Sequence, residues 1–118
     1  MLEKVSSGID IVDINRFKSL SYDENKKFYE KIFTYSEIEY CLKFEDPYSH
    51  FAAKFALKEA VIKSIDFKEN LINIETSHID SKPHVELIGE NNQNYIFEAS
   101  ISHEKDYAVA IVLSEKTH

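Results

Sequence analysis

Two acidic residues lie in short segments that predict a dry environment. Asp10 lies within residues 8–12 (GIDIV), a run of mostly β-branched residues that predicts a strand. Glu59 lies within residues 58–63 (KEAVIK), which predict a helix. A carboxylate removed from water needs a counter-charge. One divalent cation held between the two acids would supply it and could also bind a pyrophosphate, so the pair indicates an enzyme.

Each acid also has a simpler interpretation that the residues alone leave open. Asp10 could pair with Arg16, Lys58 or backbone N–H groups. Glu59 could form an exposed ion pair with Lys63, one helical turn later.

Three lysines of the same predicted helix and one histidine are candidate phosphate ligands. Lys54 and Lys58 are four residues apart and so are neighbours, and Lys63 lies one turn past Glu59. Ammonium groups bind phosphate oxygens, although a solvated helix face would carry the same lysines. His103 ends a predicted strand, where it could donate to a phosphate, act as a base or occupy a surface turn.

The composition excludes several other classes of protein. Two glycines are too few for a Walker loop or a dinucleotide-binding loop. Cys41 is the only cysteine, and the five histidines lack zinc-type spacing, so we expect neither an internal disulfide nor a zinc site. The net charge of −7 argues against nucleic-acid binding, and no apolar run approaches the ~20 residues of a membrane span. We expect a soluble, cytoplasmic protein.

The elements that position these side chains change type half-way along the chain. A strand at residues 8–14 leads, with Asp13 as a possible cap, into a short helix through Leu20. The predicted helices that follow span residues 22–31, 34–44 and 48–65, the second opened by a capping box at Thr34–Glu37. The predicted strands of the second half span residues 71–76, 84–88, 95–102 and 107–113, with a clear turn at residues 89–94. We predict a single α+β domain over residues 1–118: an N-terminal strand, a helical segment with one long helix, and a small antiparallel sheet.

Three segments together resemble the signatures of the 4′-phosphopantetheinyl transferases. Residues 8–16 are similar to the family's N-terminal signature, and residues 51–64 resemble its second signature, centred on Lys-Glu-Ala. Residues 100–110 are similar to the closing segment of the small holo-(acyl-carrier-protein) synthase branch. The segments have the family's order and separations. Val12 stands where the larger, two-domain transferases have a second acid, which also favours the small branch.

The resemblance implies a reaction and a site. Coenzyme A would donate its 4′-phosphopantetheine arm to a serine of an apo acyl or peptidyl carrier protein and release adenosine 3′,5′-bisphosphate, as in fatty-acid and lipid biosynthesis. Asp10 and Glu59 would bind Mg²⁺ and act in catalysis with Lys63. The serine proton would pass to a water at the metal or to a carboxylate, with Glu59 the first choice. Arg16 would face the carrier, and the coenzyme A phosphates would be held by Lys54, Lys58, Lys63 and His103.

The resemblance also implies a homotrimer with active sites between subunits. Asp10 and Glu59 would then come from one chain, whereas the adenine pocket, and His103 with it, would involve a neighbour. Two departures from the family pattern matter: residues 65–70 contain no glycine where the family has a glycine-rich turn, and Tyr22-Asp23-Glu24 interrupts the basic docking helix. The interrupted docking helix, with the net charge of −7, motivates the hypothesis of a specialised carrier, and the missing glycines motivate that of a degenerate module that binds coenzyme A or a carrier without catalysis. A plain structural oligomer without a ligand is a third alternative.

Overall fold

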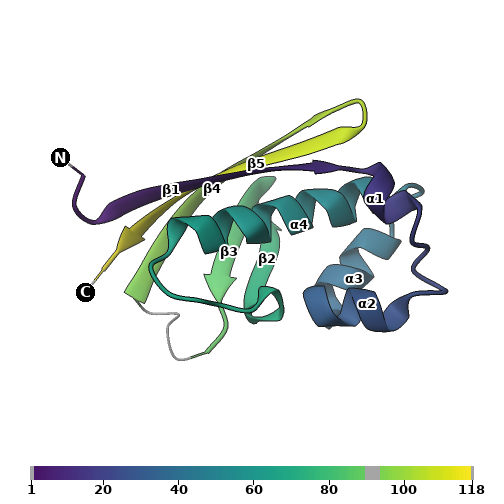
Figure 1. The fold of residues 1–118 in the computed structure, drawn as a ribbon, viewed down its shortest axis with the longest axis horizontal. Helices are drawn as coiled ribbons and strands as arrows, with labels where there is room; N and C mark the ends of the chain where they lie inside the picture. The colour runs from purple at the N-terminus through teal and green to yellow at the C-terminus, as the bar shows by residue number, and fades with distance from the viewer. Residues whose placement is uncertain (1, 90–93, 118) are drawn as a thin grey trace.

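The strands form two antiparallel sheets, and the long helix α4 (Pro47–Ser64) packs against the larger one (Figure 1). This computed structural model describes residues 2–89 and 94–117. In the larger sheet β5 (Tyr107–Lys116) lies between β1 (Val5–Asp13) and β4 (Tyr95–Glu104). The smaller sheet pairs β2 (Ile74–Ile79) with β3 (Lys82–Leu87), and β3 packs beside β4. The predicted α+β fold is confirmed.

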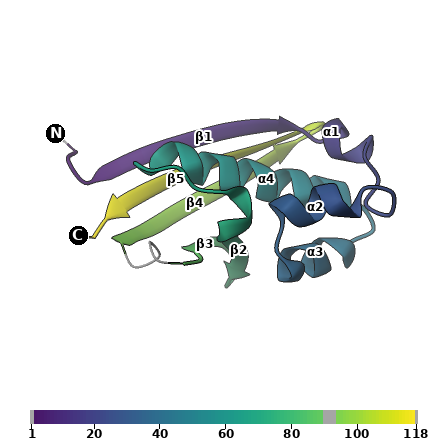
Figure 2. The same ribbon diagram turned by 60° about the horizontal axis from the view of Figure 1, so that its bottom comes forward.

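Three short helices lie together at one end of α4. They are α1 (Asn15–Lys18), α2 (Lys26–Ile32) and α3 (Tyr35–Leu42), and a 3₁₀ helix, η1 (Leu71–Asn73), precedes β2. Figures 1 and 2 both show this helical end opposite the two chain termini. Its core is aromatic: the Tyr29 ring packs against Phe33 and Phe51, and its hydroxyl donates to the Leu20 carbonyl at 2.6 Å.

One face of β1 packs on α4, and the other face is open. Gly8 and Val12 are buried on the α4 side, whereas the alternate residues Ile9 and Ile11 are 59% and 62% exposed. The period of two expected of a half-buried strand is therefore present. The facing side of α4 is lined by small residues, because Ala52, Ala56 and Ala60 are all fully buried.

Gly8 sets how closely β1 approaches α4. A Cβ atom at this position would lie 1.9 Å from the Ala60 carbonyl oxygen and 3.1 Å from the Lys63 Cβ. Only glycine fits such a contact between a strand and a helix backbone. The residue two positions later on the same face, Asp10, is therefore held next to the C-terminal half of α4.

Most predicted elements are present, with differences at their ends. The capping box of α3 is confirmed, with Thr34 accepting from the Glu37 N–H. The helix predicted from residue 22 begins only at Lys26, and residues 71–73 form a 3₁₀ helix where a strand was predicted. The Asp13 carboxylate accepts from the Asn15 N–H at 3.0 Å, but the cap position is Ile14. Of the predicted turn at 89–94, residues 90–93 lie outside the described residues. No described helix is both long and apolar enough to cross a bilayer.

Candidate active site

Asp10 and Lys63 meet at the contact between β1 and α4. The Lys63 ammonium donates to the Asp10 carboxylate at 3.2 Å and to the Ile9 carbonyl at 2.9 Å. The Asp10 side chain is only 17% exposed. The lysine therefore ties the helix to the strand and supplies the counter-charge that a half-buried carboxylate needs.

Glu59 is a second carboxylate beside this pair. Burial raises the pKa of Glu59, the charge of Asp10 raises it further, and the charges of Lys63 and Arg16 oppose this rise. The strand acid and the helix acid predicted from the sequence therefore lie within electrostatic reach of each other. Within residues 2–89 and 94–117, Glu59 makes no hydrogen bond or ion pair, so the alternative of a Glu59–Lys63 ion pair is not what the structure contains.

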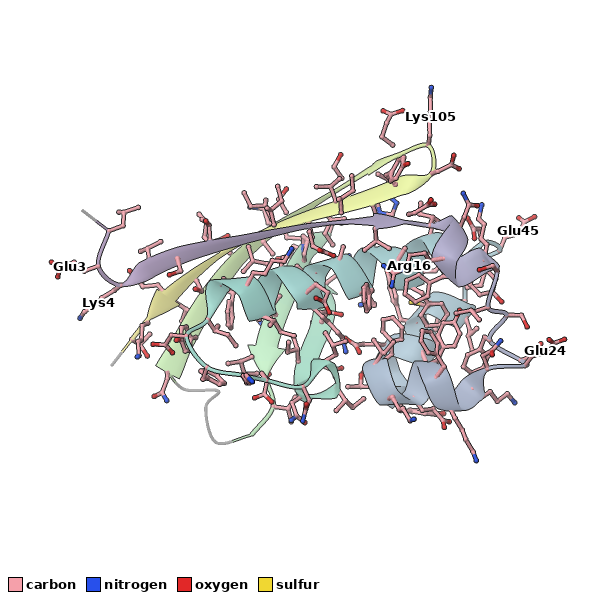
Figure 3. The ribbon with its side chains drawn as sticks, in the orientation of Figure 1. Glu3, Lys4, Arg16, Glu24, Glu45 and Lys105 are labelled. Carbon is pink, nitrogen blue, oxygen red and sulfur yellow. The ribbon has the colours of Figure 1, made fainter. Side chains whose placement is uncertain are left out.

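Arg16 is a second cation whose charge acts on Glu59. Its guanidinium carbon lies 5.3 Å from the centre of the Phe55 ring of α4. Figure 3 shows Arg16 where α1 meets α4, whereas Glu24 and Lys105 project away from the molecule. The site thus combines two acids with two cations, and Arg16 is exposed at its edge.

A second cluster of predicted residues lies on another side of α4. Lys54 and His103 line a cavity of ≈ 400 Å³ between α3, α4, the β2–β3 hairpin and β4. His50 and His78 line the same cavity, and none of the described residues that line it is acidic. Lys54 is only 4% exposed; its ammonium donates to the Thr76 carbonyl at 3.1 Å and to the Thr76 hydroxyl at 3.0 Å. A buried cation among histidines, without a carboxylate partner in the described chain, is suited to an anion.

The sequence analysis missed His50 and His78. His50 stacks on Phe44 with ring centres 3.6 Å apart, and His78 stacks on Tyr40 at 5.3 Å. Burial is the main cause that lowers the pKa of both histidines; the nearby His103 also lowers that of His50, and Lys54 that of His78. One signal was available: His50 precedes Lys54 by four residues, so both lie on one helix face.

Comparisons with known proteins identify the family of this chain. A sequence model of the 4′-phosphopantetheinyl transferase superfamily matches residues 6–112. The chain belongs to this superfamily. It is 43% identical to the holo-[acyl-carrier-protein] synthase of Thermodesulfovibrio yellowstonii over 116 residues, covering 96% of this chain and 98% of that protein.

Two solved structures of the superfamily resemble this one closely. The Helicobacter pylori holo-[acyl-carrier-protein] synthase, in complex with coenzyme A, is 33% identical with a TM-score of 0.79, covering 92% of this chain and 99% of that chain. The Bacillus anthracis enzyme, in complex with CoA (3′,5′-ADP), is 30% identical with a TM-score of 0.77, covering 95% and 96%. The predicted small branch of the 4′-phosphopantetheinyl transferases is therefore confirmed.

Lys58 does not have the position predicted for a phosphate ligand of this transferase. It is fully buried, and its ammonium lies 2.6 Å from a carboxylate oxygen of Glu37. It also donates to the carbonyls of Ile32 at 2.6 Å and Leu71 at 3.1 Å. With its donors directed at these internal acceptors, Lys58 joins α2, α3 and η1 to α4, and we withdraw it from the predicted phosphate contacts.

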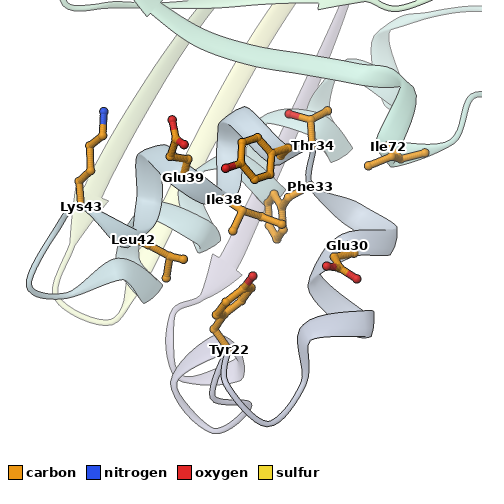
Figure 4. A pocket seen from close by; sticks show the side chains of 10 residues that line it. Tyr22, Glu30, Phe33, Thr34, Ile38, Glu39, Leu42, Lys43 and Ile72 are labelled. Atoms are coloured by element: carbon orange, nitrogen blue, oxygen red, sulfur yellow. The ribbon is translucent and has the colours of Figure 1, made fainter.

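The transferase also has a mainly apolar cavity that contains none of the predicted site residues. This cavity, ≈ 480 Å³, lies between α2, α3 and η1 (Figure 4). Phe33, Ile38 and Leu42 line it, with Glu30 and Lys43 at its edges. Among the described residues, its lining contains no cluster of cations suited to phosphate.

Proposed function

We propose that this protein transfers the 4′-phosphopantetheine group of coenzyme A to a serine of an apo carrier protein and releases adenosine 3′,5′-bisphosphate. The observation that supports this most strongly is that Asp10, which Lys63 of α4 hydrogen-bonds, and Glu59 of the same helix lie close enough for their charges to interact across the contact between β1 and α4. Relatives of similar length and fold that are named for this activity add support, and two of them bind coenzyme A or its 3′,5′-bisphosphate portion. Residues 1–118 would act as one catalytic domain.

The donor set at this contact fits Mg²⁺. Mg²⁺ takes one or two protein carboxylates and completes its coordination with waters and substrate phosphates. Asp10 and Glu59 provide such a pair, and among the described residues no three His, Cys, Asp or Glu side chains converge into a closed metal site. When bound there, the cation would offset the negative charge on the phosphoryl and leaving-group oxygens.

Glu59 is the residue we propose as proton acceptor. When the serine oxygen forms a bond to the phosphorus of the pantetheine arm, the bond from that phosphorus to the bisphosphate leaving group breaks, and the serine proton must be accepted. Glu59 has no hydrogen-bond partner in the described chain, so an oxygen of its carboxylate would remain available to accept the proton beside a bound cation. Lys63, which bonds Asp10, would contact the phosphates at the reacting centre.

The cavity with Lys54 and His103 would hold the remaining phosphate of coenzyme A. Coenzyme A carries a diphosphate and a separate phosphomonoester on its ribose. If the diphosphate lies at Asp10 and Glu59, the monoester is the group left for the second cluster. A buried ammonium and three histidines without a lining acid support that assignment.

We also propose a homotrimer with sites shared between chains. Lys63 hydrogen-bonds Asp10 of β1, and the charge of Asp10 also acts on Glu59. Lys54 instead hydrogen-bonds Thr76 of β2. Within one chain, α4 therefore separates the two acids from the cavity that Lys54 lines. The outer face of the large sheet exposes apolar side chains that a neighbouring chain could cover: Ile9, Ile11, Ile111 and Leu113.

Arg16 would face the acidic carrier, and the reaction would take place in the cytoplasm and serve fatty-acid or lipid synthesis.

Mass spectrometry of carriers tests the proposal. The purified protein is incubated with coenzyme A, Mg²⁺ and a panel of apo carriers, including one of fatty-acid synthesis. We expect a gain of one phosphopantetheine on at least one carrier, abolished by a chelator. Binding of coenzyme A without a mass gain on any carrier would instead support the non-catalytic module, and equal rates on all carriers at matched salt would refute a specialised carrier.

A further inference from the structure

A buried network of charged and polar side chains leads from the interior of the helical end to the wall of the cavity lined by Lys54 and three histidines, called here the histidine cavity. One Glu37 oxygen accepts from the Thr34 N–H at 2.8 Å and lies 2.6 Å from the Lys58 ammonium. The other accepts from the Thr76 N–H at 2.8 Å and from the Thr76 hydroxyl at 2.6 Å.

The charges fix the direction of the hydroxyl at the end of this network. Ionised Glu37 can only accept, so the Thr76 hydroxyl donates its single proton to Glu37. Its lone pairs then face Lys54, whose ammonium can only donate. The Thr76 carbonyl accepts a second N–H of Lys54, and the ammonium lies 4.8 Å from the Tyr40 ring centre. Thr76 therefore holds Lys54 through two acceptors at once.

In this network, the Lys54 ammonium has no carboxylate in direct contact with it among the described residues. Lys58 is the direct ion-pair partner of Glu37, and the two acceptors of Lys54 belong to the neutral Thr76. A buried cation without a contacting carboxylate gains more from an incoming anion than a paired one does. Lys54 lines the cavity that also contains His50, His78 and His103.

We propose that Thr76, oriented by Glu37, is a positioning residue that fixes the Lys54 ammonium at the cavity wall and so sets the affinity for the phosphomonoester of coenzyme A. This inference rests on the proposed function. It assigns to Thr76 an effect on substrate binding and none on the transfer step, because Thr76 lies on β2 whereas Asp10 and Glu59 lie at the β1–α4 contact.

The test compares Thr76→Val with Thr76→Ser in steady-state transfer. The valine keeps the shape and the backbone contacts of Thr76 but removes the hydroxyl; Glu37 retains Lys58 and two N–H donors, so the fold should persist. We expect Thr76→Val to raise KM for coenzyme A about tenfold with kcat within about twofold of wild type, as for the loss of one hydrogen bond that orients a charged group. Thr76→Ser should behave as wild type.

Two further measurements separate positioning from a general structural effect. In a Lys54→Met background, Thr76→Val should raise KM no further, and KM for dephospho-coenzyme A, which lacks the monoester, should be unchanged by Thr76→Val. An unchanged KM for coenzyme A, or an equal rise in the Lys54→Met background, overturns the inference. Thr76→Ala makes the same comparison if the valine variant does not fold. Absence of transfer by wild type would be a failure of the proposed function instead.

Discussion

At the residue scale, the site places two like charges in a partly buried position. Asp10 has Lys63 as a direct partner, whereas the charge of Glu59 is opposed only at longer range by Lys63 and Arg16. The pKa of Glu59 is raised because burial and the charge of Asp10 both disfavour its ionised form. Catalytic groups are commonly held in such unfavourable settings.

The raised pKa predicts that Glu59→Gln stabilises the metal-free protein at neutral pH. The folded state binds the Glu59 proton more tightly than the unfolded state does, so above the ordinary pKa of 4.5 the ionised side chain favours unfolding. Glu59→Gln should raise Tm by a few degrees at about pH 7.5, and this gain should disappear as the pH falls below 4.5. Thermal unfolding in the presence of a chelator measures both; exposed Glu39→Gln on α3 is the control. A lower Tm for Glu59→Gln at neutral pH would contradict this account.

At the element scale, the site depends on the close packing of β1 on α4. Gly8→Ala would place a Cβ 1.9 Å from the Ala60 carbonyl oxygen, so the strand and the helix would have to separate. We expect a loss of about 1–3 kcal/mol in the free energy of unfolding and a lower kcat, because Asp10 moves with the strand. Urea denaturation and the transfer assay measure the two effects. Ser7→Ala, an exposed neighbour in β1, should change neither; wild-type stability in Gly8→Ala would show that the contact is looser than described.

Lys58→Met tests whether this lysine joins elements together or binds substrate. Removing the ammonium leaves Glu37 buried without its direct ion-pair partner, so we expect a loss of about 3–5 kcal/mol in the free energy of unfolding. Urea denaturation measures it, with exposed Lys68→Met as the control. Near-wild-type stability together with a large rise in KM for coenzyme A would instead restore Lys58 as a phosphate contact.

The sequence predicted the elements wherever a local pattern decides them. The capping box at Thr34–Glu37 depends on neighbours three residues apart and is present, and the predicted long helix is present as α4, although it is buried on most of its sides. The local pattern was a poorer guide at residues 22–25: a helix was predicted from residue 22, but α2 begins only at Lys26. The β2–β3 turn was not predicted because its two residues, Asp80 and Ser81, adopt positive φ without glycine.

The sequence predicted the two acids of the site but not all of their neighbours. Asp10 and Glu59 were recognisable because each lies in an unusual local setting. Lys58 was assigned wrongly, because its partner Glu37 lies 21 residues away and no spacing rule connects them. His50 and His78 come from different elements and meet only in the folded chain. Long-range pairing therefore accounts for what sequence reasoning missed.

At the scale of the whole molecule, the two clusters lie toward opposite edges of the large sheet. β1 carries Asp10, β4 carries His103, and β5 lies between them. Strands two apart are separated by about 10 Å, and α4 packs against this sheet between the clusters. A substrate bound across a subunit boundary would use the acids of one chain and the histidine cavity of the next.

Subunit mixing tests that arrangement. Asp10→Asn lacks the acid, and Lys54→Met lacks the buried cation of the cavity. If each site is built from two chains, exchange of subunits between the variants should restore about a quarter of wild-type activity, because a quarter of boundaries then combine two intact halves. The transfer assay at low coenzyme A concentration measures this after dilution from mild denaturant. Activity equal to the mean of the two variants would place the complete site within one chain.

The most direct test of the account is the binding of a divalent cation to Asp10 and Glu59 together. Mn²⁺ prefers the same oxygen ligands as Mg²⁺, and its binding in the presence of coenzyme A can be titrated by electron paramagnetic resonance. We predict one Mn²⁺ per chain in wild type, with affinity at least about tenfold lower in both Asp10→Asn and Glu59→Gln. Wild-type Mn²⁺ affinity in both variants would contradict the proposed metal-binding site.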